Sequence, residues 1–165
     1  MSTIERFTRA QDAAHAGLTD ALAELKAGQK QGHWIWYVFP QLRGLGSSST
    51  ARAFGIQGRD EAETYLRDDV LRGRLMQSIA VVEAQMLPPP SRPLDALMGS
   101  HIDALKLVSS LTLFEAVAAD LQQGHHFVAV AGVAEQAGAV LDLAATQGFA
   151  RCRFTLEALA RPHGA

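Results

Sequence analysis

The sequence predicts a mainly α-helical fold: a single helical domain over residues 1–165, arranged as a multihelical orthogonal bundle with one extended aromatic and Pro-Gly segment near residues 33–46. Three observations predict it. Apolar residues recur at helical spacing along most of the chain. Apolar and polar residues alternate over the length of a strand only within residues 34–39, and no Asn-Gly hairpin turn is present. A length of 165 residues suits one core of ordinary size.

The N-terminal stretch is expected to be helical. Ser2 or Thr3 can cap its start, and Glu5 follows Ser2 by three residues, which is the spacing of a capping box. We expect a break near Gly17 and a stop at Gly28, because glycine readily takes the left-handed conformation that ends helices.

A second helical run covers residues 59–86, with an expected interruption near Asp69 and Gly73. The sequence LPPPSRP at residues 87–93 cannot continue a helix, because proline lacks the amide donor and fixes its own φ angle. We interpret it as an extended connector inside the domain.

The clearest helix covers residues 101–121. Two further helices are expected over residues 127–143 and 153–160. Within the first of these three, five apolar residues follow a spacing of four, three, four and three, which places them on one buried stripe. They are Leu107, Leu111, Phe114, Ala118 and Leu121.

The composition excludes several classes of protein. Hydrophobic residues make up 48% of the chain and charged residues 19%, which is far from the composition of disordered chains. The formal net charge is −2, so Lys and Arg are not in excess. We therefore expect neither duplex DNA nor a membrane surface as a partner.

The chain is expected to be cytoplasmic. Its first residues include acids and no apolar leader, and the most apolar long stretch, residues 127–145, contains Glu135, Gln136 and Asp142 and is too polar for a good membrane span. Cys152 is the only cysteine, so no disulfide can form within the chain. We expect this residue to be a small buried side chain in a reducing compartment.

Residues 32–46, GHWIWYVFPQLRGLG, concentrate the aromatic residues of a chain that is otherwise poor in them. Pro40 disfavours the helical conformation of the residue before it, so Phe39 is expected to be extended. Any helix through Trp34 is therefore expected to end before Phe39.

The loop that follows has the sequence GLGSSST. Its glycines permit a tight turn, and its hydroxyl residues can cap a helix through residues 51–54. Free amides at a helix start and two flanking arginines can bind a phosphate or carboxylate, with a Trp face nearby to stack a ring. The candidate anion-binding residues are Arg43, Gly44, Gly46, Ser47, Ser48 and Arg52.

A structural interpretation of the same residues stays open. The aromatic side chains can be core residues, the glycines a plain turn and one serine a helix cap. The loop is neither a dinucleotide fingerprint nor a Walker loop, since it lacks the third spaced glycine of the first and the Gly-Lys of the second. His33 has no visible partner that would define a role for it.

A second polar face lies on the 101–121 helix. Asp103, Lys106 and Ser110 are spaced i, i+3 and i+7 and share a face beside the apolar stripe. Asp103 and Lys106 can form an ordinary ion pair, worth about 0.3–0.5 kcal/mol if exposed. In the functional alternative, this face is the polar wall of a cleft whose aromatic wall is residues 33–41.

In this shared-site hypothesis, Asp103 holds Lys106 or acts as an acid or base. The ligand-binding candidates are His33, Trp34, Trp36, Gln41, Lys106, Ser110 and Thr112.

Several stretches resemble one family. The string KQGHWIWYVFPQLRGLGSS carries its hallmark, AFGIQGRDEAETYL is similar to its Tyr-x-Ile and Glu-Ala-x-x-Tyr-Leu elements, and IDALKLVSSLTLF looks like its Asp-x-x-Lys-x-x-Ser-Ser-x-Thr-Leu-Phe element. The shorter strings RFTRAQ, VLRGRL and FTLEAL extend the resemblance over nearly the full chain. The family is an uncharacterised set of bacterial and fungal domains of unknown function, often labelled calpastatin.

The resemblance implies a compact, chiefly helical domain and no established activity. Calpastatin itself is a disordered inhibitor, whereas this composition forms a core, so the label does not fit the chain. The chain departs from the family at two positions. Phe54 stands where Tyr is common, and Cys152, three residues before Thr155, stands where an Asp is expected. If that Asp serves a shared chemistry, this chain has lost it.

Three functions from different classes stay open. The first is binding of a small anionic or nucleotide-like ligand in an aromatic-lined cleft. The second is a protein-interaction or structural module. The third is a metal-independent hydrolase of a glycosidic or phosphate-linked bond that uses Asp103. No metal or cofactor is expected, because His125 and His126 have no Cys, Asp or Glu at ligand spacing and no HExxH motif is present.

Overall fold

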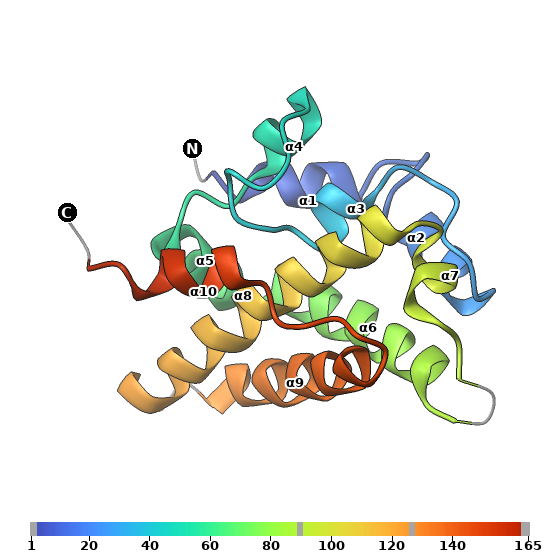
Figure 1. Cartoon of the computed structure of the whole chain (residues 1–165). Helices are drawn as coiled ribbons and strands as arrows, with labels where there is room; N and C mark the ends of the chain where they lie inside the picture. The colour runs from blue at the N-terminus through green and yellow to red at the C-terminus, as the bar shows by residue number, and fades with distance from the viewer. Residues whose placement is uncertain (1–2, 89–90, 126–127, 163–165) are drawn as a thin grey trace.

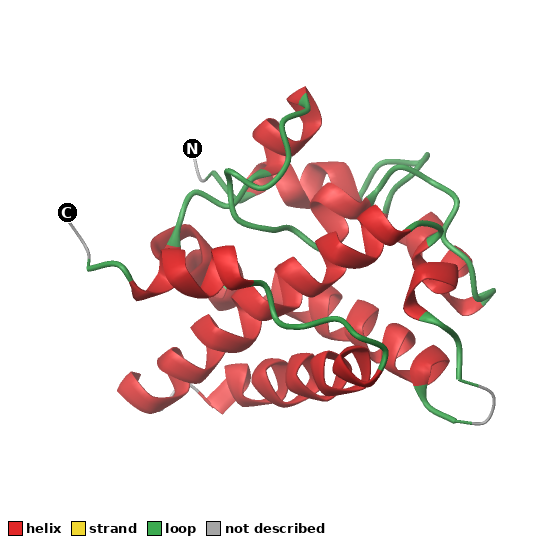
Figure 2. Ribbon diagram, in the orientation of Figure 1, coloured by secondary structure: helices red, strands yellow, loops and turns green. Residues whose placement is uncertain are grey.

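The structure, a computed structural model, describes residues 3–88, 91–125 and 128–162. Over these residues the regular elements are helices, as the red ribbon of Figure 2 shows, which confirms the predicted mainly α fold. A 3-10 turn, Val128–Val130, precedes the ninth α-helix. The α-helices are α1 (Glu5–Gln11), α2 (Leu18–Lys26), α3 (Ile35–Val38), α4 (Ser49–Phe54), α5 (Arg59–Arg67), α6 (Asp69–Met86), α7 (Leu94–Met98), α8 (His101–His125), α9 (Ala131–Thr146) and α10 (Arg153–Ala160).

The longest helix, α8, forms the axis of the molecule. In Figure 1 it crosses the centre of the view diagonally, with α9 beneath it and α10 in front of it. It packs against α5, α7, α9 and α10. Its predicted apolar stripe is buried, and none of the five side chains is more than 3% exposed: Leu107, Leu111, Phe114, Ala118 and Leu121.

Several predicted boundaries are confirmed. α2 ends at Lys26, and Gly28 follows with a φ of 90°, the left-handed conformation expected after a helix end. Ser48 caps α4, because its hydroxyl accepts the amide of Ala51 at 3.1 Å. α10 spans the predicted residues. The described part of the segment 87–93 contains no helix.

The start of the chain differs from the prediction. α1 begins at Glu5, and the residue before it, Ile4, makes no side-chain cap. Ser2, which was predicted to complete a capping box, lies outside the described residues.

The interruption in the second helical run falls at Asp68. Its carboxylate accepts the amide of Leu71 at 2.9 Å and thereby caps α6. The predicted interruption at Gly73 is wrong, since α6 continues through it. Gly73 is exposed, so its low helix propensity costs only about 1 kcal/mol and disturbs no packing.

The expectation of an extended segment near residues 33–46 needs a correction. Ile35–Val38 form one helical turn, α3, which buries Ile35 and Val38. The segment leaves the helical conformation at Phe39, with φ −125° and ψ 74°, as the following proline requires. The alternating pattern was too short to distinguish a strand from a single buried turn.

α7 was not predicted. It buries Leu94, Leu97 and Met98 against the N-terminal part of α8. A helix of five residues is too short to show a periodic pattern.

α9 packs against α6 and α8 through a buried face. The stretch Val128–Thr146 is long and apolar enough to cross a membrane, with a mean hydropathy of 1.4, and 33% of it is buried in the fold. A core helix of a globular fold meets the same criterion. Phe127, the first residue of the predicted helix, lies outside the described residues.

Candidate functional site

The aromatic segment is anchored in the core by Trp34. Its side chain is fully buried, and its Nε1 donates to Oε1 of Glu24 at 3.1 Å. The same carboxylate oxygen accepts the amides of Gln31 and Gly32, both at 2.6 Å. Burial alone would raise the pKa of Glu24, but these three hydrogen bonds and the charge of Lys30 lower it below its ordinary value. Trp34 is therefore part of the core and offers no free face to a ligand.

Asp103 of α8 contacts two lysines, one just before the aromatic segment and one on α8. Lys30 Nζ lies 2.7 Å from Asp103 Oδ2, and Lys106 Nζ lies 3.4 Å from Asp103 Oδ1. We call these three residues the lysine–aspartate cluster. Lys106 also lies over the ring of Trp36 at 4.7 Å, and Lys30 over the ring of Trp34 at 5.0 Å. The aromatic segment and the polar face of α8 thus lie against each other.

The lysine–aspartate cluster holds the aromatic segment against α8. Both oxygens of Asp103 contact a lysine ammonium group, and its role as an acid or base stays a prediction. Sequence reasoning missed Lys30, although it is the first residue of the family string quoted above. His33 is exposed and only its carbonyl is engaged, accepting the Tyr37 hydroxyl at 3.3 Å.

The other α8 candidates point into the protein. Ser110 is fully buried, and its hydroxyl has no hydrogen-bond partner among the described residues. Thr112 is also fully buried and donates to the carbonyl of Val108 at 2.7 Å. Its hydroxyl accepts the amide of Cys152 at 3.0 Å. Thr112 therefore connects α8 to the start of α10.

The Gly-Ser loop contains a helix cap and a short turn. Ser48 spends its hydroxyl on α4, and Gln41 is buried with its side-chain amide donating to the carbonyl of Leu45 at 3.2 Å. Ser47 and Arg52 are exposed. α4 has six residues, and Ser48 already caps its start. A plain turn followed by a helix cap therefore accounts for these residues without a bound anion.

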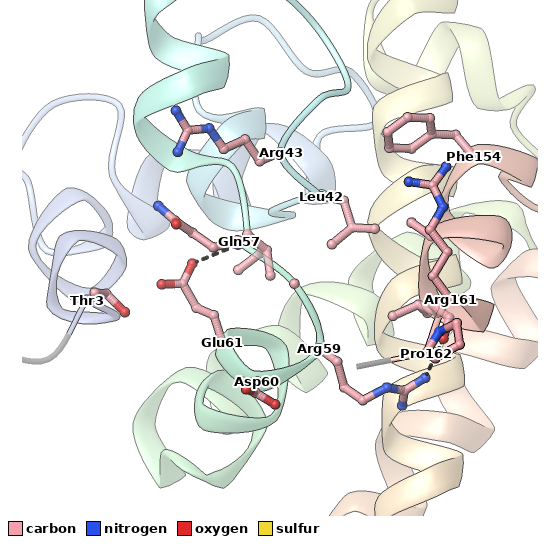
Figure 3. Close-up of a pocket in the computed structure, with 14 residues that line it drawn as sticks. Thr3, Leu42, Arg43, Gln57, Arg59, Asp60, Glu61, Phe154, Arg161 and Pro162 are labelled. Carbon is pink, nitrogen blue, oxygen red and sulfur yellow. Dashed lines mark hydrogen bonds between the residues drawn. The ribbon is translucent and has the colours of Figure 1, made fainter. Parts of the chain in front are cut away.

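A groove of about 640 Å³ lies elsewhere, between the start of α5 and the end of α10 (Figure 3). Its floor is the isolated bridge between Leu42 and Ile56, which joins the loops before and after α4. The first residues of α5 line one side, and Phe154, Ala158 and Leu159 of α10 line the other. The groove therefore has an apolar floor and one exposed aromatic ring, that of Phe154, which is 43% exposed.

Two charged residues that line this groove are already paired. Glu61 receives two hydrogen bonds from the guanidinium of Arg6, at 2.6 and 3.1 Å. Burial alone would raise the pKa of Glu61, but hydrogen bonds from Arg6, Thr3 and the amide of Gln57, together with the charge of Arg6, outweigh it and lower the pKa. Arg59 donates to Asp120 at 2.6 Å and to the carbonyl of Leu159 at 3.1 Å, which fixes the end of α10 against α5.

Two further arginines border the groove with unpaired side chains. The guanidinium groups of Arg43 and Arg161 have no hydrogen-bond or ion-pair partner among the described residues, and both residues are exposed. In Figure 3 they lie on opposite sides of the groove. The two acids of the lining, Asp60 and Glu61, both have interaction partners. The two unpaired guanidinium groups therefore favour an anion in the groove.

Gly44 lies against Phe154, one of the residues that line the groove. It has a φ of 103°, and a Cβ built on it would lie 3.0 Å from the ring of Phe154. The loop backbone therefore approaches the ring as closely as a side-chain-free residue permits.

Of the predicted ligand residues, the groove includes Arg43 alone, with Gly44 packed behind Phe154. The lysine–aspartate cluster includes Asp103 and Lys106. Sequence reasoning missed Arg161 and Phe154. The string FTLEAL, which begins at Phe154, was the one available signal for this wall.

Cys152 occupies the N-cap position of α10. It is half-buried, where the sequence analysis expected a buried residue. Its backbone is extended, with φ −66° and ψ 111°. This position explains the Asp that the family resemblance led us to expect, because Asp is among the best N-cap residues.

We expect Cys152→Asp to raise the free energy of unfolding by about 1 kcal/mol at pH 7, because a carboxylate caps the α10 amides better than a thiol. The folded carboxylate would have a pKa below its unfolded value of about 3.9, so the gain is present above that pH and is lost as the pH falls through the folded pKa. Urea unfolding at pH 7 and pH 3 measures it. Cys152→Ala is the control, and equal stabilities of the two variants at pH 7 would contradict the prediction.

The described residues contain no group of three or more His, Cys, Asp or Glu side chains placed to hold a metal ion.

Comparison with known proteins places the chain in a family. The family model described as a protein of unknown function (DUF1810) matches residues 1–134. The chain belongs to this family. The DUF1810 match includes the lysine–aspartate cluster and ends before α10, so Phe154 and Arg161 lie beyond it.

A solved structure extends the comparison over α10. The conserved hypothetical protein Rv1873 from Mycobacterium tuberculosis is 33% identical, and the similarity covers 98% of this chain and 99% of that one with a TM-score of 0.72. No curated protein matches the sequence. The DUF1810 match therefore establishes the family but names no activity, so a function has to be inferred from the geometry of the site.

Proposed function

We propose that this DUF1810 protein binds a small anionic molecule in the groove between α5 and α10. The observation that carries the proposal is the pair of unpartnered guanidinium groups, Arg43 and Arg161, on either side of an apolar floor. Guanidinium groups bind phosphates and carboxylates through paired hydrogen bonds. An apolar cleft with a few convergent polar groups is the usual form of a small-molecule site.

The groove also accommodates the rest of such a molecule. Leu42 can contact an apolar body, and the exposed ring of Phe154 can stack on a base or aromatic ring. A nucleotide or another phosphorylated ring compound meets both requirements. The lysine–aspartate cluster is a weaker candidate for this role, because both lysines contact Asp103 and the Lys30 side chain is only 5% exposed.

The test begins with thermal unfolding in the presence of AMP, ADP, ribose 5-phosphate, phenyl phosphate and inorganic phosphate. A ligand at about 100 times its dissociation constant stabilises the folded protein by about 2.7 kcal/mol. We expect phenyl phosphate or a nucleotide to shift the transition more than inorganic phosphate does, because the apolar floor contacts the ring. If none of these probes shifts the transition, the proposal is wrong.

Titration of the best probe against variants locates the site. Arg43→Gln and Arg161→Gln should each weaken binding about ten-fold or more, because a hydrogen bond to a charged group contributes about 1.5–3 kcal/mol. Arg52→Gln removes the same charge from an exposed residue outside the groove and should leave the affinity unchanged. Equal affinities of the three variants would place the ligand elsewhere.

A further inference from the structure

α10 contributes few buried side chains to the fold. Of its eight residues only Thr155 is buried, and the side chains of Phe154 and Leu156 are each 43% exposed. Ala158 and Leu159 are half-buried. An element with few buried apolar side chains opens locally at a lower free energy than the core does. The position of α10 therefore depends on the polar contacts at its two ends.

The start of α10 is anchored on α8 and α9. The Thr112 hydroxyl accepts the amide of Cys152 at 3.0 Å. Arg151 donates to both carboxylate oxygens of Glu115, at 2.8 and 2.9 Å, and to Asp142 at 3.2 Å. Two core helices thus hold the residues just before α10, and these residues form a fixed pivot for the helix.

The guanidinium of Arg59 holds the end of α10. The last carbonyls of a helix have no partner within it, and Arg59 donates to the carbonyl of Leu159 at 3.1 Å. The other terminal nitrogen of Arg59 donates to Asp120 of α8 at 2.6 Å. Because a guanidinium is a rigid planar fork, the carboxylate orients the nitrogen that reaches α10. We call Arg59 and Asp120 the α10 strap.

The strap acts next to one of the two unpaired arginines of the groove. Leu159 and Arg161 line the groove, whereas Asp120 does not. The backbone leaves the helix at Arg161, with φ −70° and ψ 137°, two residues after the carbonyl that Arg59 holds. Figure 3 shows this hydrogen bond as a dashed line next to Pro162. The strap therefore fixes the backbone from which Arg161 extends.

We propose that α10 is a movable wall of the groove and that the α10 strap couples its docking to anion binding, an inference that rests on the proposed function. In the docked state, Phe154 and Arg161 complete the groove opposite Arg43. In the undocked state, the end of α10 moves away about its anchored start. A molecule that contacts both walls binds the docked state alone and stabilises it. Arg59 and Asp120 are positioning residues, because they act through α10.

Removing the carboxylate of the strap separates this proposal from a purely electrostatic effect. Asp120 lies outside the groove lining and is 54% exposed. Charge alone predicts that Asp120→Ala strengthens anion binding, since a nearby negative charge is lost. Coupling through α10 predicts the opposite sign. We expect the affinity to fall about three-fold or more, because a smaller fraction of the protein is docked and competent to bind.

Asp12→Ala is the matched control. Asp12, at the end of α1, pairs with Arg74 of α6 at 2.7 Å, and the two side chains are 58% and 24% exposed. The corresponding values for Asp120 and Arg59 are 54% and 20%. Asp12→Ala removes an equally exposed partner of an arginine that does not contact α10. It should leave both anion affinity and the motion of α10 unchanged.

Hydrogen–deuterium exchange without added anion tests the strap by itself. In Asp120→Ala we expect the amides of residues 157–160 to exchange about five-fold faster or more than in the parent protein, with those of α9 unchanged. In Asp12→Ala they should exchange as in the parent protein. Equal rates at residues 157–160 in the two variants would overturn the strap. An equal acceleration in α9 would also overturn it, because the effect would then be global.

Addition of an anion tests the coupling. The probe is phenyl phosphate or AMP, whichever binds the parent protein more tightly. At saturation it should slow exchange at residues 157–160 of the parent protein about three-fold or more, and it should bind Asp120→Ala more weakly. Unchanged exchange, or an affinity of Asp120→Ala equal to or above that of the parent, would overturn the coupling. If neither probe binds the parent protein, the coupling falls with the proposed function, whereas the exchange of the anion-free variants still decides the strap.

Discussion

Replacing Asp103 by alanine should lower the free energy of unfolding by about 3 kcal/mol, because it leaves the ammonium of Lys30 without its carboxylate. The Lys30 side chain is only 5% exposed, so water cannot replace the lost partner. Lys106 is 20% exposed and can turn to solvent, so it contributes less to the loss. Urea unfolding of the variant and the parent protein measures the difference.

An exposed polar contact between α7 and α8 is the control. Asp95 Oδ1 lies 3.1 Å from His101 Nδ1, and the two side chains are 53% and 64% exposed. Asp95→Ala should cost less than about 0.5 kcal/mol. If Asp103→Ala costs no more than Asp95→Ala, the lysine–aspartate cluster does not hold the aromatic segment. Combining Lys30→Met with Asp103→Leu should recover most of the lost stability, because the buried charge is then absent.

Truncating Leu111 to alanine should cost about 2–5 kcal/mol, because the side chain is fully buried in the centre of α8 and its removal leaves a cavity. Thermal or urea unfolding measures the change. Ile102, on the same helix and 65% exposed, is the matched control, and Ile102→Ala should stay within about 0.5 kcal/mol of the parent protein. Equal effects of the two truncations would contradict the assignment of α8 as the core helix.

The fold was predictable where a pattern repeats. The stripe of α8 extends over four turns, so its period identifies both the helix and its buried face. α3 and α7 have four and five residues, and no period can be recognised over so short a length. Pro40 still predicted correctly where α3 ends, because its effect on Phe39 is steric and local.

The sites were harder to predict, because they join distant parts of the chain. Asp103 and Lys106 are three residues apart, and their pairing follows from helical spacing. The shorter contact of Asp103 with Lys30 spans the two elements and follows from tertiary packing alone. The groove combines a loop, the start of α5 and the end of α10, and of its two unpaired arginines only Arg43 stood beside a recognisable motif.

The close approach of Gly44 to Phe154 couples the conformation of the loop to one wall of the groove. A Cβ at position 44 would lie 3.0 Å from the ring, and the ring itself lines the groove. A methyl group added there would press on the ring, and the positive φ of position 44 would strain the backbone as well. A substitution at position 44 would therefore reach the groove through Phe154, although Gly44 is not one of its lining residues.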